Sequence, residues 1–416
     1  MYSIIGRVAL AALAAILAHG AEPPKTPPES WIDPDTGHRV VRLTTEPNSA
    51  SLYFNQNGYT ADGRAMVYTT PEGISALDLR THTAKSVVKG RVQVIVTGHK
   101  TPNVYYRMGD QILSTNVDTL ETRTIAKLPP RGSVATVNAD ETLLAGTYIE
   151  GDAQAPAAAS QAGQIHPLEQ ALNKGQMMEQ RLAAHLPMAM FTISTATGEV
   201  KVIHRATDWL NHLEFSPTDP NLLMFCHEGP WHKVDRIWTI RPDGTHLVKV
   251  HTRTMAGEIF GHEFWSHDGK TIWYDLQTPR GEDFWLAGYN VDTGERTQYH
   301  LQRDEWSIHF NVTADGKLFC GDGGDPGQVA RAKNGQWIYL FRPEAIKFEG
   351  ELNDREFAQP GVLRAEKLVG MAKHNYRLEP NVSFTPDQKW VVFRSNMFGD
   401  TYTFAVEVAR AVAKAE

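Results

Sequence analysis

One turn pattern recurs along the 416-residue chain and restricts the folds that it can adopt. An apolar residue is followed by a Thr, Ser or Asn, then by Asp and usually Gly, and then by an apolar strand-like run, as in "YTADGRAMVY" and "VTADGKLFCG". Asp and Gly favour tight turns between antiparallel strands. Six clear copies and a degenerate one start at Tyr59, Val137, Phe215, Phe264, Val312, Phe384 and, for the degenerate copy, Val96. Seven copies predict seven similar units.

A second hairpin pattern follows five of these copies, as in "ALDLRTHTAKSVV" and "YNVDTGERTQYH". Two hairpins make four strands per unit, and a spacing of about 40 to 50 residues is typical of propeller blades. We therefore expect an all-β fold, a seven-bladed β-propeller with a partly helical insertion. A pair of β-sandwiches is the alternative, which the number of evenly spaced turns disfavours.

The period is interrupted near residues 151–185, where a helix-like stretch follows an Ala- and Gln-rich one, and near residues 325–373. We interpret both as insertions, which on propellers cluster on the binding face. The predicted organisation is a signal peptide over residues 1–20, a Pro-rich tail over 21–30, and the propeller over 31–416.

The short apolar run of residues 8–17 is too short to span a membrane, and small residues follow it. We therefore expect a periplasmic or secreted protein, with no membrane association after signal removal. The net charge of −7 disfavours nucleic-acid binding but allows an acidic ligand, because local charges decide that at a site. The two cysteines lie in apolar runs and are expected to be buried free thiols. The oligomeric state is not indicated.

Three histidines recur at the blade spacing. His212, His262 and His309 are 50 and 47 residues apart, at similar offsets from the turn pattern. Because the inner strands of a propeller converge on one channel, we expect the three imidazoles to surround its mouth. A single histidine is more often a satisfied polar group in a turn, but three in register favour metal binding or proton abstraction.

The last blade adds His374, Glu379 and Asn381 just before its turn. Imidazole, carboxylate and amide together with His309 suit Mn²⁺ or Ca²⁺ better than zinc, which prefers closed nitrogen and sulfur sets. The alternative is that Glu379-Pro380-Asn381 is an ordinary turn.

The segments "FCHEGPWHKVDRIWTIRPDGTHLVKV", "GHEFWSHDG", "HFNVTADGKLFCGDGG" and "SFTPDQKWVVFRSN" resemble the oligogalacturonate lyases. The resemblance implies a seven-bladed propeller that cleaves short uronate oligomers by β-elimination, with manganese in its channel. It places Arg236 and His262 on the catalytic Arg and His of the family, and His309 on the first metal ligand.

The sequence departs from the family in the last blade. Where the family has a Gln and then His-Pro-His, this chain has Tyr376 and then Glu379-Pro380-Asn381. A divalent metal is still expected, Mn²⁺ first and Ca²⁺ as the alternative. The changed ligand positions and the signal peptide suggest a related lyase with a different uronate substrate.

The resulting hypothesis is a lyase acting on an acidic oligosaccharide. His262 is the expected base and Arg236 the carboxylate-binding group, and the expected metal ligands are His309, His374, Glu379 and Asn381. The expected substrate contacts are His212, His227 and Lys233, one of the two histidines acting as a leaving-group acid.

Three other functions are alternatives to the lyase. A TolB-like propeller would bind a protein or carbohydrate partner without metal or turnover. A peptidase would need a G-x-S-x-G nucleophile turn, which the sequence lacks. Hydrolysis by two carboxylates could use Asp304, Glu305 or Asp322, but the sequence marks out no pair.

Overall fold

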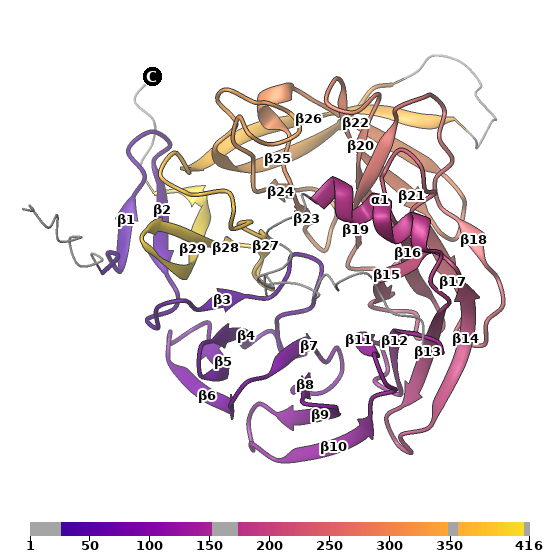
Figure 1. Cartoon of the computed structure of the whole chain (residues 1–416). Coiled ribbons are helices and arrows are strands. Elements are labelled where there is room, and N and C mark those ends of the chain that lie inside the picture. The colour runs from indigo at the N-terminus through magenta and orange to yellow at the C-terminus, as the bar shows by residue number, and fades with distance from the viewer. Residues whose placement is uncertain (1–25, 152–173, 348–356, 412–416) are drawn as a thin grey trace, which may run out of the picture.

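Seven small sheets are arranged in a ring around a central axis in the computed structural model (Figure 1). The structure describes residues 26–151, 174–347 and 357–411. Six of the blades have four antiparallel strands in sequence order, the seventh has five that include two from the N-terminal segment, and in each blade the strand before the recurring turn is the innermost. The predicted all-β, seven-bladed propeller is therefore confirmed.

The first blade consists of β3 (Ala50–Ser51), β4 (Ala65–Thr70), β5 (Gly73–Asp78) and β6 (Ala84–Lys89), and the second of β7 (Gln93–Thr97), β8 (Asn103–Met108), β9 (Gln111–Asn116) and β10 (Thr122–Lys127). The third consists of β11 (Ser133–Val137), β12 (Leu143–Ile149), β13 (Met188–Ser194) and β14 (Val200–Ala206), and the fourth of β15 (Trp209–Phe215), β16 (Leu223–Glu228), β17 (Ile237–Ile240) and β18 (Val248–Lys249).

The fifth blade consists of β19 (Ile259–Trp265), β20 (Thr271–Gln277), β21 (Phe284–Asn290) and β22 (Arg296–Leu301), and the sixth of β23 (Phe310–Val312), β24 (Phe319–Gly321), β25 (Trp337–Ala345) and β26 (Ala358–Gly370). The seventh consists of β27 (Ser383–Phe384), β28 (Trp390–Phe398), β29 (Asp400–Arg410), β2 (His38–Arg42) and β1 (Ser30–Ile32). A short 3-10 helix, η2 (Arg303–Glu305), follows β22.

The recurring turn pattern joins the first and second strands of every blade. In the first blade the Thr60 hydroxyl donates to Asp62 Oδ1 at 2.6 Å and accepts the backbone N–H of Ala65 at 3.0 Å. Gly63 there has a φ of 68°, which costs glycine little. The pattern is thus a self-contained turn, and this is why it could be recognised from the sequence.

The ring closes through strands from both ends of the chain. β2 pairs antiparallel with β29, so the N-terminal segment supplies the outer strand of the seventh blade. The fifth and sixth blades are also joined, because β22 pairs parallel with β26 at the outer edge. Both contacts cover strand edges that would otherwise be open to other chains.

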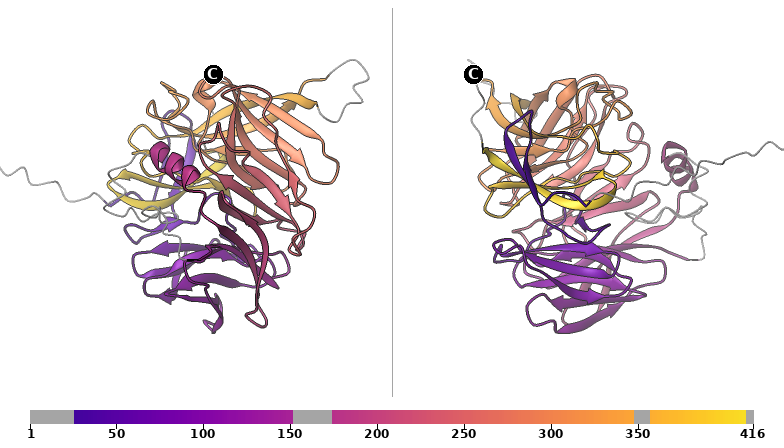
Figure 2. Two further views of the ribbon diagram at one scale, coloured as in Figure 1. Left: turned by 45° about the vertical axis from the view of Figure 1, so that its right-hand side comes forward. Right: turned by 90° about the vertical axis from the view of Figure 1, so that its left-hand side faces the viewer.

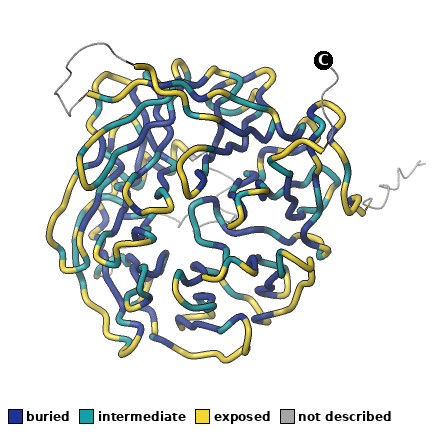
Figure 3. Tube along the Cα trace, turned by 180° about the vertical axis from the view of Figure 1, so that it is seen from behind, coloured by how far each residue is buried: buried dark blue, intermediate teal, exposed yellow. Residues whose placement is uncertain are grey.

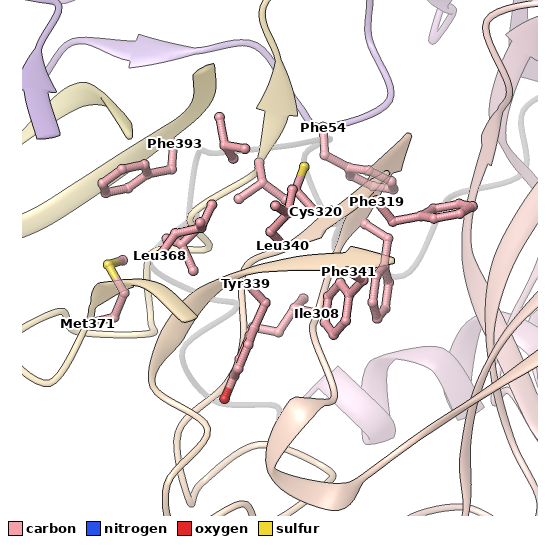
Figure 4. Packing of buried hydrophobic residues seen from close by; sticks show 14 of the residues in the cluster. Phe54, Ile308, Phe319, Cys320, Tyr339, Leu340, Phe341, Leu368, Met371 and Phe393 are labelled. Atoms are coloured by element: carbon pink, nitrogen blue, oxygen red, sulfur yellow. The ribbon is translucent and has the colours of Figure 1, made fainter. Parts of the chain in front are cut away.

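Apolar side chains fill the space between neighbouring blades. The largest buried cluster joins the fifth, sixth and seventh blades to Phe54 of the first (Figure 4). Buried residues run through the inner parts of the blades, whereas many exposed ones lie in the outer loops (Figure 3). Cys226 and Cys320 are buried free thiols, as expected.

The two expected insertions differ in kind. Helix α1 (Lys174–Ala184) lies on one face of the ring (Figure 2); residues 152–173 lie outside the described residues. The range 325–373 contains β25 and β26, so much of it forms the outer half of the sixth blade. The sequence did not show that these residues form blade strands, because the sixth blade lacks the recognisable second turn. Residues 348–356 lie outside the described residues.

The expected signal peptide lies among residues 1–25, which are also outside the described residues. Within the described part of the chain, the helices are too short or too polar to cross a bilayer.

Ring closure can be tested at β2. Val40 is fully buried and pairs with Val406, whereas its neighbour Arg39 is exposed. We expect Val40→Asp to lower the free energy of unfolding by more than about 3 kcal/mol, because it buries an unpaired charge. Arg39→Asp, the matched control, should change it by less than about 0.5 kcal/mol. Equal denaturation midpoints for the two variants would contradict the role of β2 in closure.

Candidate active site

One position on the inner strand is polar in most blades and faces the central axis. It lies three residues before the apolar residue that precedes each turn. In blades one, three, four, five, six and seven it is occupied by Gln56, Val134, His212, His262, His309 and Asn381. The expected register of the three histidines is therefore present, and Asn381 extends it.

Three of these residues have a left-handed backbone. The φ angles are 49° at His212, 48° at His262 and 54° at Asn381. Bulges shift the register of β15 between Asn211 and Glu214 and that of β19 between Gly261 and Phe264. Such a conformation costs a non-glycine residue about 1–2 kcal/mol and is concentrated at functional sites, where it redirects a side chain.

A cavity of about 2210 Å³ follows the central axis. Its lining includes Tyr53, His212, Glu214, Glu379 and Arg394, from blades one, four and seven. The channel walls thus carry imidazole, carboxylate, phenol and guanidinium groups, which suits a polar ligand.

His262 is held by a buried carboxylate. Its Nδ1 lies 3.1 Å from Asp275 Oδ1, and Asp275 is 1% exposed. A carboxylate can only accept there, so Nδ1 carries the proton and Nε2 keeps its lone pair. Nε2 has no hydrogen-bond partner among the described residues. The ring packs edge-on against Trp231 and His309, with centroids 5.1 Å from each.

His309 belongs to a buried chain of three groups. Its Nδ1 lies 2.8 Å from Asp322 Oδ2, and its Nε2 lies 3.0 Å from the Tyr53 hydroxyl. Burial raises the pKa of Tyr53 well above its usual value, and Glu379, Glu263 and Asp322 raise it further. The phenol therefore stays protonated and donates to His309.

Arg236 does not line the cavity. It is 1% exposed, its Nη1 donates to Glu228 Oε1 at 2.9 Å, and the ring of Trp231 lies 4.5 Å from its guanidinium carbon. A Cβ on Gly261 would lie 3.2 Å from Arg236 Nε, so this glycine allows the close approach beside His262. Arg236 therefore lies behind Gly261 and Trp231, both of which adjoin His262. The expected direct contact with a substrate carboxylate does not follow from this geometry, because Glu228 already holds the guanidinium.

Glu228 links Arg236 to His212. Its Oε2 lies 2.8 Å from His212 Nε2. Burial alone would raise the pKa of Glu228, but Arg236 and His212 outweigh it and the pKa is lowered. Burial would likewise lower the pKa of His212, but the attraction of Glu228 and Glu263 outweighs it and the pKa is raised. His212 is thus disposed to carry a proton in the channel.

A model of the family described as "Oligogalacturonate lyase" matches residues 26–412. The chain belongs to the oligogalacturonate lyase family. The oligogalacturonide lyase of Pectobacterium atrosepticum is 26% identical over 406 residues, covering 92% of this chain and 96% of the relative. The oligogalacturonate lyase of Dickeya dadantii is 26% identical over 403 residues, with the same coverage. The family resemblance seen in the sequence is therefore confirmed.

The fold agrees with that of solved family members. An oligogalacturonate lyase in complex with manganese superposes with a TM-score of 0.73 at 24% identity, covering 92% of this chain and 97% of that chain. The oligogalacturonate lyase of Vibrio parahaemolyticus gives the same values. At this identity the likeness concerns the fold.

The donors expected to hold a metal in this family member are not all directed to one point. His309 Nε2 lies 3.8 Å from Glu379 Oε2, but the same nitrogen bonds to Tyr53. The ring nitrogens of His374 bond to the Ser395 hydroxyl at 2.9 Å and the Leu378 carbonyl at 2.7 Å.

The Asn381 amide is also engaged: its Nδ2 donates to the Glu379 carbonyl at 3.1 Å, and its Oδ1 accepts from Phe54 N at 3.4 Å. Among the described residues no group of three His, Cys, Asp or Glu side chains is arranged to hold an ion. Of the four expected ligands only His309 and Glu379 face each other, and two ligands do not make a Mn²⁺ or Ca²⁺ site, which needs about six. The expected four-residue ligand set therefore does not fit this geometry.

Two further expected residues lie away from the cavity. His227 Nδ1 pairs with Asp208 Oδ2 at 3.2 Å, and its ring packs on Trp238. Lys233 Nζ pairs with Glu179 Oε2 of α1 at 2.7 Å, which ties the helix to this face. Of the three expected substrate contacts, the structure brings only His212 to the cavity.

Sequence reasoning missed Asp275, Tyr53 and Arg394. Asp275 is a lone acid within the apolar strand "TIWYDLQ", which is a usable signal, because a charge there needs a partner. Tyr53 comes from blade one, and only ring closure brings it beside His309 of blade six. Arg394 meets Glu379 within blade seven, through an apolar strand whose fold contacts the sequence does not show.

The buried network predicts a pH-dependent stability. Glu228→Gln leaves Arg236 without its closest counter-ion and should destabilise the fold by about 3–5 kcal/mol at neutral pH. Because the pKa of Glu228 is lowered on folding, its stabilisation is full above the ordinary value of 4.5 and is lost as the pH falls. Urea unfolding should therefore show a smaller difference between the variant and the parent at about pH 3. A difference that is unchanged in acid would contradict this.

Proposed function

We propose that this protein is a lyase that cleaves uronate-containing oligosaccharides by β-elimination and leaves a 4,5-unsaturated uronate end. The single observation that carries the proposal is the His262–Asp275 pair, placed by a left-handed backbone beside the channel with Nε2 unpartnered. Membership of the oligogalacturonate lyase family supports the same reaction class and an acidic oligosaccharide as substrate.

The base must remove a weakly acidic proton. In a 4-linked uronate the C5 proton lies α to the C6 carboxylate, and its removal places further negative charge on an anion. The neutral imidazole of His262 accepts this proton at Nε2, while Asp275 stabilises the imidazolium that forms. The C5–H electron pair becomes the C4–C5 double bond, and the C4–O bond breaks.

The departing oxygen needs a proton. His212 lines the cavity one blade away from His262, and its raised pKa keeps it protonated to higher pH. We assign it the role of general acid, with Nε2 2.8 Å from Glu228 Oε2 and Nδ1 4.0 Å from Glu263 Oε1, so that both carboxylates favour the protonated ring.

The reaction also needs positive charge at the C6 carboxylate. Arg236, the group expected from the family resemblance, is held by Glu228 beneath Trp231. The manganese that a solved relative contains would supply such charge as a Lewis acid, but the donor set here does not complete a site for it.

We further propose that residues 1–20 direct the protein to the periplasm or the medium. The apolar run of residues 8–17 followed by small residues supports this. N-terminal sequencing of the mature protein tests it, with Ala21 expected as the first residue.

His262→Ala should lower the rate of unsaturated-uronate formation by about 10²–10⁴-fold, because no other imidazole of the described residues has this placement. The measurement is ultraviolet absorbance of the product during incubation with pectic, glucuronan and ulvan oligomers. His82→Ala, in an exposed outer hairpin of the first blade, is the matched control and should keep full activity. Normal turnover by a folded His262→Ala protein would reject the assignment.

Asp275→Asn tests the orientation of the base. Asparagine can donate to Nδ1 and so favours the wrong tautomer, and we expect kcat to fall by about 10–10⁴-fold with little change in KM. A loss confined to KM would instead indicate a role in substrate binding.

A further inference from the structure

One cation in the channel has no role in the scheme above. Arg394 lies on β28 and lines the cavity. Its Nε donates to the Glu379 carbonyl at 2.8 Å, and its backbone N–H donates to the Pro380 carbonyl at 2.9 Å. The side chain is therefore anchored at its inner end to the segment that precedes the last inner strand.

The outer edge of this guanidinium is unused. Nη1 and Nη2 make no hydrogen bond or ion pair with the described residues. The acidic neighbours of Arg394, Glu379 foremost, act on it from beyond ion-pair distance, so this partly buried cation can still attract an anion. Two parallel N–H groups on one planar edge match the two oxygens of a carboxylate.

The surroundings place this edge at the reacting centre. Glu379, whose carbonyl holds Arg394, also has its Oε2 3.8 Å from His309 Nε2. Tyr53 bonds to His309, and the His309 ring packs against His262. A continuous series of contacts thus runs from Glu379 and Arg394 to the proposed base.

The same position is unfavourable for a metal ion. A divalent cation between His309 and Glu379 would be placed near the permanent positive charge of Arg394, and like charges in a partly buried site repel strongly. His374 and Asn381 already bond to other protein groups, so neither is available as a metal ligand.

We propose that Arg394 binds the uronate carboxylate and supplies the positive charge for elimination, so that this family member works without a bound metal. This rests on the lyase function proposed above. Arg394 holds the two carboxylate oxygens through Nη1 and Nη2, and the charge that develops when the C5 proton leaves is stabilised by the guanidinium.

The test uses the full chain, three variants and two probes. Arg394→Met removes the charge and Arg394→Lys keeps it without the planar edge; Arg39→Met, on the exposed outer strand of the same blade, is the matched control. The probes are trigalacturonate and its methyl ester. Binding is measured by calorimetry in the His262→Ala background, turnover by absorbance with and without EDTA, and metal content by mass spectrometry.

We expect the purified protein to contain less than one metal ion per chain and to keep its turnover in EDTA. Arg394→Met should weaken trigalacturonate binding by about 10- to 100-fold, with Arg394→Lys intermediate and Arg39→Met unchanged. The methyl ester should bind weakly to the parent and equally weakly to Arg394→Met. Circular dichroism establishes that each variant is folded.

Two results would overturn the proposal while leaving the lyase intact. One is turnover that EDTA abolishes and Mn²⁺ restores; the other is a folded Arg394→Met protein that binds trigalacturonate as well as the parent. Carboxylate-dependent binding through Arg394 without any product would instead reject the lyase and keep the binding site. Absence of binding to either probe in the parent would reject both.

Discussion

Packing of one blade against the next is the constraint on which the rest of the molecule depends. A four-stranded sheet cannot bury both of its faces alone, so each blade needs a neighbour on either side. The ring satisfies this seven times, and pairing of β2 with β29 closes it. Because the blades are equivalent, one position on every inner strand faces the same axis. Chemistry spread over some 340 residues, from Tyr53 to Arg394, is gathered there as a consequence of closure.

The channel wall has two layers with different tasks. His212 and Arg394 line the cavity, and His262 lies beside it on the strand that supplies Phe264; each has a polar atom without a hydrogen bond to the described residues. Behind them lie the carboxylates Asp275 and Glu228, which hold the imidazoles at a defined nitrogen. The left-handed backbone at His212 and His262 adds a conformational cost that the surrounding strands must sustain. A site of this kind keeps its geometry before a ligand arrives.

The last blade is where the sequence departs from the pattern expected of the family. Glu379 and Asn381 occupy places where imidazoles were expected from the family, and their amide and carbonyl groups bond to the protein. The carbonyl of Glu379 anchors a guanidinium instead. A fixed cation of the protein and a bound metal ion are physically alternative ways of stabilising charge on a sugar carboxylate.

The sequence by itself determined the repeated turns, the number of blades and the register of His212, His262 and His309, because those features depend on residues close together in the chain. It could not reveal that Arg236 is occupied by Glu228, that both nitrogens of His374 are engaged, or that the sixth blade extends through residues 325–373. Nor could it bring Tyr53 to His309 across 256 positions. Those outcomes were decided by tertiary structure, since the orientation of a buried polar group is set by whichever partners ring closure places beside it.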